Sequence, residues 1–377
     1  MRILHLIHSE GVYGAERVLL YLAREQKRQG HVPLVGSIQD PGTAETAFEA
    51  LAASWGLQVE PIRIAPRPTP GVVRALLRNV RKVQPDVLHS HGYKANVLLG
   101  PLPRSWRGPM LTTLHGWTQP RRLSALWLYE QLDRLALRRM DSVVVVSKHM
   151  LTLGAVASIR ASRLRVIENG IPPLEVREAD SAAHGVAPVP RELIEFLSQA
   201  PTLIAIGRLS REKGFPLLIE AFARARERAR AVHQLLIVGE GPDRELLAGR
   251  VEAFRLGGIV RLAGYVEAAD RLLKHAAGFV MSSVTEGLPL ALLEAIQRRV
   301  PVLATSVGPI PELLDEGWHG SLVVPGDLAG LTQGLQSLMT TAHDSNQAVV
   351  RAFEAISTIY TSSGMAARYL DAYRAIR

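Results

Sequence analysis

The feature that most constrains the fold is an alternation of short apolar runs with amphipathic helical patterns, which occurs twice along the chain. Alternating strands and helices predict a parallel sheet with helices on both faces. The sequence therefore predicts an α/β chain with two doubly wound, Rossmann-like domains. The expected strands are residues 2–8, 31–38, 86–90, 110–114 and 142–147 in the first series, and 202–206, 234–238, 259–262, 278–281 and 302–304 in the second.

Composition places the boundary between the two series. A stretch around residues 172–190 is rich in proline, alanine and charge, which is typical of a linker. A chain of 377 residues is also longer than one hydrophobic core ordinarily accommodates. We expect a first domain over 1–175, a linker over 176–198, a second domain over 199–357 and a final amphipathic helix over 358–377.

The excess positive charge lies in the first half of the chain. Residues 1–175 carry 23 Lys and Arg against 13 Asp and Glu, whereas residues 176–377 carry 21 against 22. Val72–Val83 places basic residues on one helical face, and Trp117–Met140 combines arginines with tryptophan and leucine. Such faces can rest on an anionic membrane, although Val72–Val83 also fits an ordinary solvated helix face. No recognition motif for nucleic acid occurs, so nucleic acid is not an expected partner.

Several classes of protein are excluded by composition. Cysteine is absent, which excludes a disulfide scaffold, thiol catalysis and cysteine-ligated zinc. The first eight residues are too short and polar for a signal peptide. No stretch reaches the ~18 apolar residues needed to span a bilayer. We expect a cytoplasmic protein that can associate with the inner face of the membrane.

Two carboxylates, Glu286 and Glu294, bracket a Gly-Leu-Pro turn that reads as the start of a helix. Pro289 suits the first helical position. Glu286 is then expected in the loop at the positive end of the helix, and Glu294 about two turns inside it. Helix N-termini bind anions, and carboxylates accept hydrogen bonds from hydroxyls. The segment therefore predicts a site for a phosphorylated sugar.

Glycine-rich turns follow the first strand of each series. Arg208 and Lys213, between Gly207 and Gly214, offer a planar donor fork and a point charge suited to a diphosphate; the alternative is a solvated basic loop. The turn that ends at Gly14 has the spacing G-x-x-G rather than G-x-G-x-x-G, and no acidic residue ends the second strand. A dehydrogenase is therefore not expected.

The histidines call for separate interpretations. His89 and His91 alternate at the end of a strand, and we expect them on opposite faces, so that this pair does not ligate a metal. His115 ends a strand before Gly116 and is expected to face the ligand. His5 is expected to pack in the core. No metal site is predicted.

These motifs together resemble a known family. The runs 206–214, 235–242 and 260–266, with the Glu286/Glu294 pair, are similar to family 4 of the retaining glycosyltransferases, which have the GT-B fold. Residues 14–18, 114–116 and 166–171 resemble the family's first-domain motifs. The resemblance implies an acceptor-binding first domain that faces a nucleotide-sugar-binding second domain across a cleft. The final helix would cross back to the first domain.

The resemblance also implies residue roles. Arg208 and Lys213 would neutralise the donor diphosphate, and Glu294 would bind the ribose hydroxyls. Glu286, with the amides of Gly287 and Leu288, would hold the transferred sugar. A departure is Tyr13, which replaces the usual glycine before Gly14. The implied catalytic residues are Arg208, Lys213, Glu286 and His115, and the implied donor-binding residues are Gly14, Gly207, Tyr265, Val266, Gly287, Leu288 and Glu294.

The implied activity is retaining transfer of a hexose or N-acetylhexosamine from a nucleotide diphosphate to a lipid-linked or saccharide acceptor, in the synthesis of cell-surface polysaccharide or glycoconjugate. It needs no metal and no cofactor besides the nucleotide-sugar co-substrate. Glu286 is either a nucleophile or, as we favour, a binder of hydroxyls while the acceptor attacks from the same face. The alternatives are a nucleotide-sugar epimerase of the same fold and a non-catalytic protein that binds carbohydrate or nucleotide.

Overall fold

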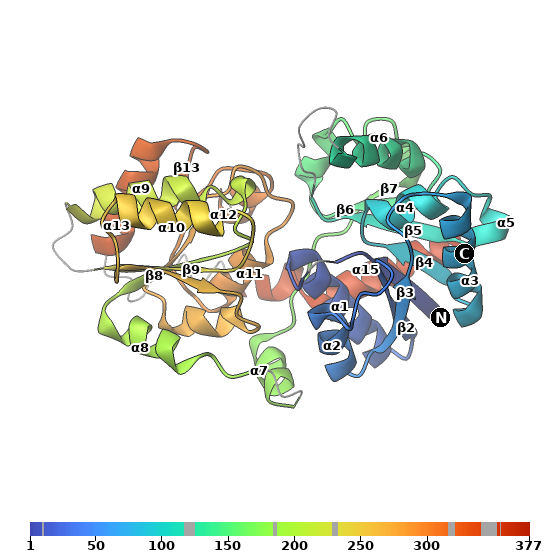
Figure 1. Ribbon diagram of the computed structural model, residues 1–377, viewed down its shortest axis with the longest axis horizontal. Coiled ribbons are helices and arrows are strands. Elements are labelled where there is room, and N and C mark those ends of the chain that lie inside the picture. Colours follow the sequence, from blue (N-terminus) through green and yellow to red (C-terminus); the bar gives the residue numbers. More distant parts are fainter. Residues whose placement is uncertain are drawn as a thin grey trace. The chain divides into compact units, whose positions relative to one another are not determined.

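The computed structural model describes residues 1–9, 11–116, 125–183, 187–227, 233–315, 321–340, 353–354 and 356–377. The chain forms two compact units, Met1–Pro172 with Tyr360–Arg377, and Pro173–Ile359 (Figure 1). Residues 176–198, the expected linker, lie in the second unit and form most of helices α7 (Leu174–Ala183) and α8 (Arg191–Gln199). Helix α8 is ordered by an apolar stripe that is buried, namely Leu193, Phe196 and Leu197.

The first unit contains a seven-stranded parallel sheet in the order β3-β2-β1-β4-β5-β6-β7. The direction in which strands are added reverses between β1 and β4, which makes this pair a topological switch point. All five predicted strands are present, and β3 and β7 were not predicted. The strands are β1 (Arg2–Ile7), β2 (Val32–Gln39), β3 (Gln58–Arg63), β4 (Val87–Ser90), β5 (Met110–Leu114), β6 (Ser142–Val145) and β7 (Leu164–Val166).

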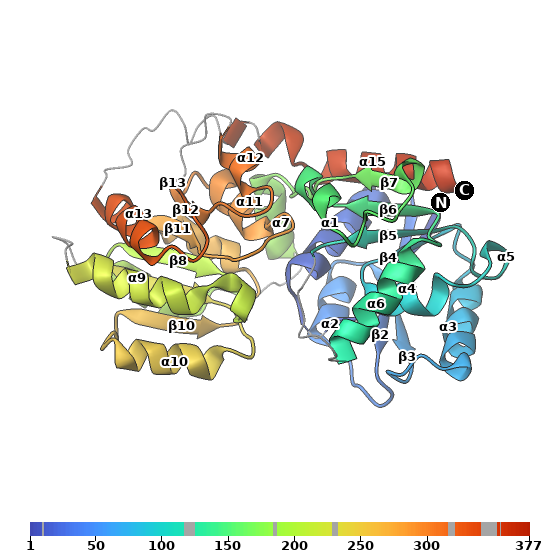
Figure 2. The ribbon, with the colours of Figure 1, turned by 90° about the horizontal axis from the view of Figure 1, so that it is seen from above.

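Helices cover both faces of this sheet. Helix α1 (Gly14–Arg28) and the final helix α15 (Ser362–Ile376) lie side by side (Figures 1 and 2). The main chain leading into α15 is fixed by hydrogen bonds in which Ile171 N donates to Tyr360 O (2.8 Å) and Ser362 N donates to Ile171 O (3.0 Å). The predicted return of the final helix to the first domain is therefore confirmed. The other helices are α2 (Ala47–Ser54), α3 (Pro70–Val83), α4 (Tyr93–Leu99), α5 (Arg104–Arg107) and α6 (Ala125–Leu137), with the short 3-10 helices η1 (Lys148–Thr152) and η2 (Ala161–Arg163).

The second unit contains a six-stranded parallel sheet in the order β10-β9-β8-β11-β12-β13, with its switch point between β8 and β11. All five predicted strands are present, and β13 is additional. The strands are β8 (Thr202–Ile206), β9 (Gln234–Val238), β10 (Val260–Gly264), β11 (Gly278–Met281), β12 (Val302–Thr305) and β13 (Ser321–Val323). The remaining helices are η3 (Arg211–Lys213), α9 (Phe215–Glu227), α10 (Arg244–Ala253), η4 (Ala269–His275), α11 (Leu290–Gln297), α12 (Ile310–Asp315) and α13 (Leu328–Thr340).

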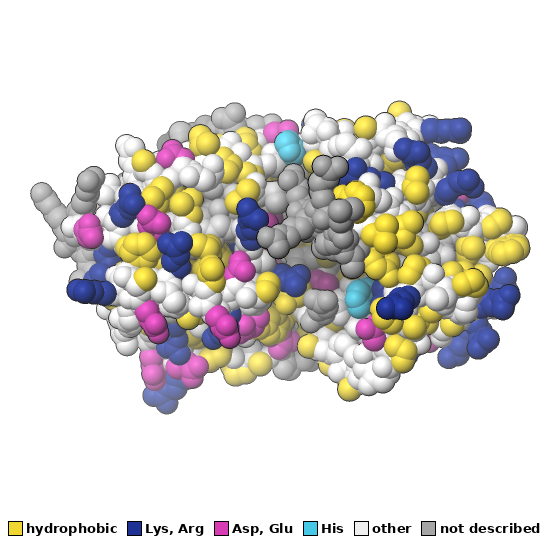
Figure 3. Space-filling model, turned by 45° about the horizontal axis from the view of Figure 1, so that its top comes forward, with side chains coloured by type: hydrophobic (Ala, Val, Ile, Leu, Met, Phe, Trp, Pro, Cys, Tyr) yellow, Lys and Arg dark blue, Asp and Glu magenta, His cyan; other side chains and the backbone are white. Residues whose placement is uncertain are grey.

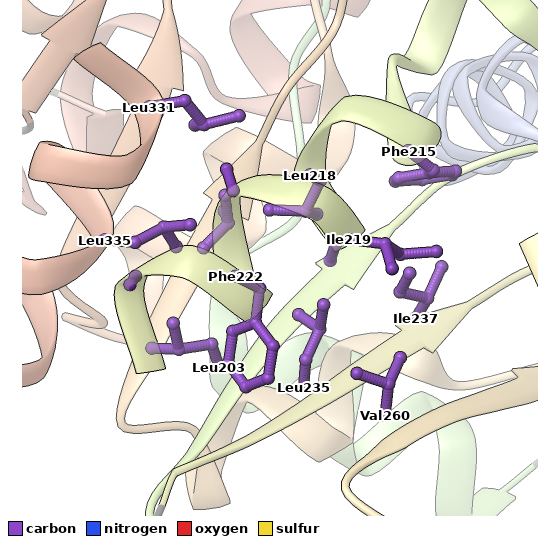
Figure 4. Close-up of a cluster of buried hydrophobic side chains, with 14 of the residues drawn as sticks. Leu203, Phe215, Leu218, Ile219, Phe222, Leu235, Ile237, Val260, Leu331 and Leu335 are labelled. Atoms are coloured by element: carbon purple, nitrogen blue, oxygen red, sulfur yellow. The ribbon is translucent and has the colours of Figure 1, made fainter. Parts of the chain in front are cut away.

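The core of the second unit lies between this sheet and helices α9 and α13. Phe222 of α9 and Leu335 of α13 are completely buried beside Leu203 of β8 and Leu235 of β9 (Figure 4). Burial on this scale fixes the strands, and the loops at their carboxyl ends are held in turn.

No helix in the part of the chain that the structure describes is long and apolar enough to cross a membrane. Helix α3 has the predicted amphipathic character, since Val72, Leu76 and Val80 are buried while Arg74 and Arg78 are exposed. Part of the other basic segment, including Trp117, Arg121, Arg122 and Leu123, lies outside the described residues.

Candidate functional site

The loops that follow β8 and β9 form one hydrogen-bonded platform at the carboxyl edge of the second sheet. Gly207 N donates to Val238 O (3.0 Å), and Leu209 N donates to Glu240 O (2.9 Å). A Cβ atom at Gly239 would overlap the carbonyl oxygen of Gly207. The two loops can therefore approach this closely only because glycine stands at 239.

Lys213 and Glu286 meet at the switch point between β8 and β11. Lys213 Nζ donates to Glu286 Oε1 at 2.6 Å, and Ser283 Oγ donates to the same oxygen at 2.6 Å. The side chains are 21% and 8% exposed, respectively. Ser282 Oγ donates to the carbonyl oxygen of Lys213 (2.8 Å), which ties the two loops together. The sequence placed these residues far apart, and the fold brings their charges into contact.

Glycines make this contact possible. Gly214 has a φ of +64°, and a Cβ there would overlap the carbonyl oxygen of Ser282. Gly308 has a φ of +55°, and a Cβ there would overlap the carbonyl oxygen of Glu286. Both positions combine a left-handed backbone with close approach, which only glycine tolerates without strain.

Other predicted donor residues lie along the same edge. Arg208 is exposed directly after Gly207. Tyr265 is 44% exposed and, with Val266, follows β10. Gly287 and Leu288 are buried and follow Glu286. Since carboxyl ends of parallel strands share one edge of a sheet, these residues lie along one side of the second unit.

Glu294 lies deeper than the sequence suggested. Helix α11 begins at Leu290 with Pro289 as its N-cap, so Glu294 is in the second turn. Its side chain is 1% exposed, and its Oε1 is 3.3 Å from Nη1 of Arg177. Glu294, which was predicted to bind ribose, is therefore paired with an arginine from α7.

Arg177 belongs to a buried cluster of charges. Its Nη1 donates to Asp270 Oδ2 at 3.0 Å, and its Nη2 donates to Oε1 of Gln297. Arg298 Nη2 donates to the same Asp270 oxygen at 3.2 Å. Arg177 was not predicted, because a single arginine in a segment read as a linker gives no signal of a partner far along the chain.

The remaining predicted residues, Gly14 and His115, belong to the first unit. Gly14 is the first residue of α1 and is exposed. Glu16 Oε2 accepts a hydrogen bond from Tyr13 N (3.0 Å), which orders the turn before the helix. His115 directly follows β5 and is partly buried.

The expectation that His89 and His91 lie on opposite faces is wrong. Their ring centroids are 4.0 Å apart, because side chains two residues apart along a strand share a face. His5 of β1 pairs in register with His89, and its ring lies within 5.2 Å of the ring of His91. His5 is buried, as expected, but within a polar cluster.

The histidine rings form a hydrogen-bonded chain. His5 Nδ1 is 3.0 Å from His91 Nε2, and His91 Nδ1 is 2.9 Å from His115 Nε2. Burial lowers the pKa of His5 to about 4 and that of His115 to about 4, and it also lowers the pKa of His89 and His91. All four rings are therefore neutral near pH 7.

His5, His89 and His91 lie close enough to hold a metal ion, since one nitrogen of each falls within 4.8 Å of the others. Every ring nitrogen of the three is nevertheless already hydrogen-bonded. His5 Nε2 contacts Gln26 Oε1 (2.8 Å), and His89 contacts Tyr373 Oη (2.6 Å) and Thr113 Oγ1 (2.8 Å). The geometry describes a proton-sharing chain better than a set of metal ligands.

Comparison with known protein families gives one match for each half of the chain. Residues 12–173 match the family described as Glycosyltransferase Family 4. Residues 200–341 match the family described as Glycosyl transferases group 1.

Named relatives are also glycosyltransferases. The putative colanic acid biosynthesis glycosyltransferase WcaL of Salmonella typhimurium is 30% identical over 156 residues, which is 39% of this chain and 38% of the length of WcaL. Glycogen synthase of Mycobacterium tuberculosis is 26% identical over 318 residues, which is 82% of this chain and 72% of that protein. Among solved structures, Anabaena HepE in complex with UDP and glucose has a TM-score of 0.80 at 20% identity and covers 98% of each chain. This last likeness shows a shared fold.

Proposed function

Because the chain belongs to family 4 of the glycosyltransferases and has the GT-B fold, we propose that it transfers a hexose-type sugar from a nucleotide diphosphate to an acceptor, with retention of anomeric configuration. The contact between Lys213 Nζ and Glu286 Oε1 at 2.6 Å carries the proposal. The contact brings a cation and a carboxylate, which can accept hydrogen bonds from sugar hydroxyls, together at a switch point, where doubly wound sheets bind ligands.

The proposed chemistry follows from the charges at this edge. Cleavage of the bond between the anomeric carbon and phosphate builds negative charge on the departing diphosphate. Lys213 and the exposed Arg208 would stabilise that charge, and the proposed reaction would then need no metal. The departing phosphate oxygen would accept the proton of the attacking hydroxyl.

Glu286 is proposed as a binder of sugar hydroxyls rather than as a nucleophile. Its Oε1 accepts hydrogen bonds from Lys213 and from Ser283. Both bonds draw electron density from that oxygen, which weakens its attack on carbon. The amides of Gly287 and Leu288 directly follow and would bind further hydroxyls.

For the acceptor, we propose a saccharide or lipid-linked saccharide of a cell-surface polysaccharide or glycoconjugate. The name of the relative WcaL supports this class. The first unit supports it too, because exposed Arg74, Arg78 and Arg81 line α3. Leu128 and Leu135 of α6 are 55% and 57% exposed. Figure 3 shows Lys and Arg side chains gathered on the first unit (right), with hydrophobic side chains beside them.

We also propose that the first unit contacts an anionic membrane through α3, and this proposal predicts binding to anionic vesicles. Reversing three charges, in the variant Arg74→Glu, Arg78→Glu and Arg81→Glu, is expected to lower co-sedimentation with phosphatidylglycerol vesicles at least tenfold, since each charge near such a surface is worth ~1 kcal/mol. The control reverses the exposed Arg191, Arg250 and Arg255 of the second unit. Equal losses in both triple variants would contradict a specific contact through α3.

The donor proposal predicts a selective thermal shift. In a panel of UDP-, GDP- and ADP-sugars, at least one at 100 times its dissociation constant should stabilise the protein by ~2.7 kcal/mol. Product analysis of that donor then separates the alternatives. An epimerase converts the donor sugar without an acceptor, and a binding protein produces no turnover. The proposal fails if no member of the panel shifts the unfolding temperature.

A further inference from the structure

The hydrogen-bonded histidine chain of the first unit ends at His115, at the carboxyl edge of the sheet. At its other end it is bonded to side chains of helices α1 and α15. His5 Nε2 contacts Gln26 Oε1 of α1 (2.8 Å), and Gln26 Nε2 donates to Tyr373 Oη of α15 (3.2 Å). Gln26 and Tyr373 are completely buried. No water can therefore substitute for either partner, and each hydrogen bond constrains the next.

The direction of every bond follows from Gln26. Its Nε2 is engaged as a donor to Tyr373, so its Oε1 accepts and His5 must carry its proton on Nε2. A neutral ring has one N–H, so His5 Nδ1 accepts from His91 Nε2. By the same reasoning His91 Nδ1 accepts from His115 Nε2. His115 thereby holds its single proton on Nε2.

The other branch from Gln26 has the same polarity. Tyr373 Oη accepts from Gln26, so its own proton is directed to His89 Nδ1 at 2.6 Å. His89 Nε2 then donates to Thr113 Oγ1 at 2.8 Å. Burial raises the pKa of Tyr373 well above its usual value, so the phenol keeps this proton. The two branches are mutually consistent.

The chain leaves one nitrogen unused. Nδ1 of His115 is buried and has no hydrogen-bond partner among the described residues. A buried acceptor without a partner costs ~1–3 kcal/mol, so such an atom marks a place where a donor is missing. A hydroxyl can donate a hydrogen bond to this nitrogen, whereas an ionised phosphate or carboxylate cannot.

We propose that Gln26 and Tyr373 are positioning residues that fix His115 in the Nε2–H tautomer, so that its Nδ1 accepts a hydrogen bond from a ligand hydroxyl. The proposal rests on the proposed function in one respect, since the hydroxyl is then one of the transferred or accepting sugar. The final helix thereby acts on His115, at the carboxyl edge of the first sheet, through hydrogen bonds that pass from Tyr373 along Gln26, His5 and His91.

The direct test is the protonation pattern of His115 in the full chain. Two-bond ¹H–¹⁵N correlation spectra of ¹⁵N-histidine-labelled protein near pH 7, with EDTA present, distinguish Nε2–H from Nδ1–H rings, and His115→Asn assigns the signal. The expected result is Nε2–H. A ring protonated on Nδ1, or on both nitrogens, overturns the proposal whether or not the protein is an enzyme.

A variant test separates positioning from folding. Gln26→Met should convert the His115 signal to a mixture of tautomers, and so should Tyr373→Phe. Gln29→Met, at the exposed C-cap of helix α1, should leave the His115 signal unchanged. A His115 signal that is unaltered in a folded Gln26→Met protein overturns the assignment.

Turnover supplies the link to function. Gln26→Met is expected to lower kcat/KM about tenfold in the native background, as loss of one positioning hydrogen bond would, and less than twofold in a His115→Ala background. Equal losses in both backgrounds would show that Gln26 acts on the fold and not through His115. Absence of turnover with an Nε2–H signal would instead contradict the proposed function alone.

Discussion

Replacing Lys213 with methionine is expected to lower kcat ~10²–10³-fold, the loss typical of removing one well-placed donor to developing negative charge. Methionine matches lysine in chain length as far as Cε, so it occupies the space beside Gly207, where an added Cβ would meet the methylenes of Lys213. Only the charge and its hydrogen bond to Glu286 are lost. The measurement is release of nucleoside diphosphate from the donor identified by thermal shift.

The matched control is Lys274→Met. Lys274 is exposed near the end of η4, which leads into the amino end of β11. Loss of this charge should change kcat less than twofold. A Lys213→Met enzyme that retains native turnover would contradict the assignment of Lys213 to the diphosphate. A fall of equal size in Lys274→Met would show a general effect of charge.

Replacing Arg177 with methionine is expected to destabilise the second unit by ~3–5 kcal/mol, because it removes the cation paired with buried Glu294 and one of the two cations paired with Asp270. Arg177 is 6% exposed, and its partners Asp270 and Glu294 are 9% and 1% exposed. Water cannot replace the guanidinium at these positions. Denaturant unfolding monitored by far-ultraviolet circular dichroism measures the change.

The control for this variant is an arginine of the same unit that pairs on the surface. Arg191 Nε lies 2.8 Å from Glu195 Oε1, but its side chain is 92% exposed. Exposed pairs contribute ~0–1 kcal/mol, so Arg191→Met should have little effect. If the two variants are equally stable, Glu294 is not held by Arg177, and the description of this cluster is wrong.

The sequence predicted most of the fold because buried strands are continuous apolar runs between turn residues. β5, β8, β9 and β11 have the predicted bounds for this reason. β3 escaped prediction because it is an edge strand with exposed Gln58 and Pro61. β7 and β13 are short and only partly buried. Weak burial leaves a weak pattern.

The site was predicted less completely, for a different reason. Lys213 and Glu286 stand in motifs, and their types indicated a phosphorylated ligand. Arg177, the partner of Glu294, stands in no motif, because it reaches Glu294 only through the packing of α7. His89 and His91 were predicted on opposite faces of the strand, although residues two apart along a strand share a face. Gln26 and Tyr373 join the histidine chain from helices at opposite ends of the sequence.

The central claim is retaining transfer from a nucleotide sugar at the Lys213–Glu286 edge. NMR spectroscopy of a reaction with the shifted donor and a panel of saccharide acceptors records both the released nucleoside diphosphate and the anomeric configuration of the first product. The expected result is release of nucleoside diphosphate together with a product that has the anomeric configuration of the donor. Both the release and the product should be lost in Lys213→Met. Inverted configuration, or no release from any donor that binds, would contradict the claim.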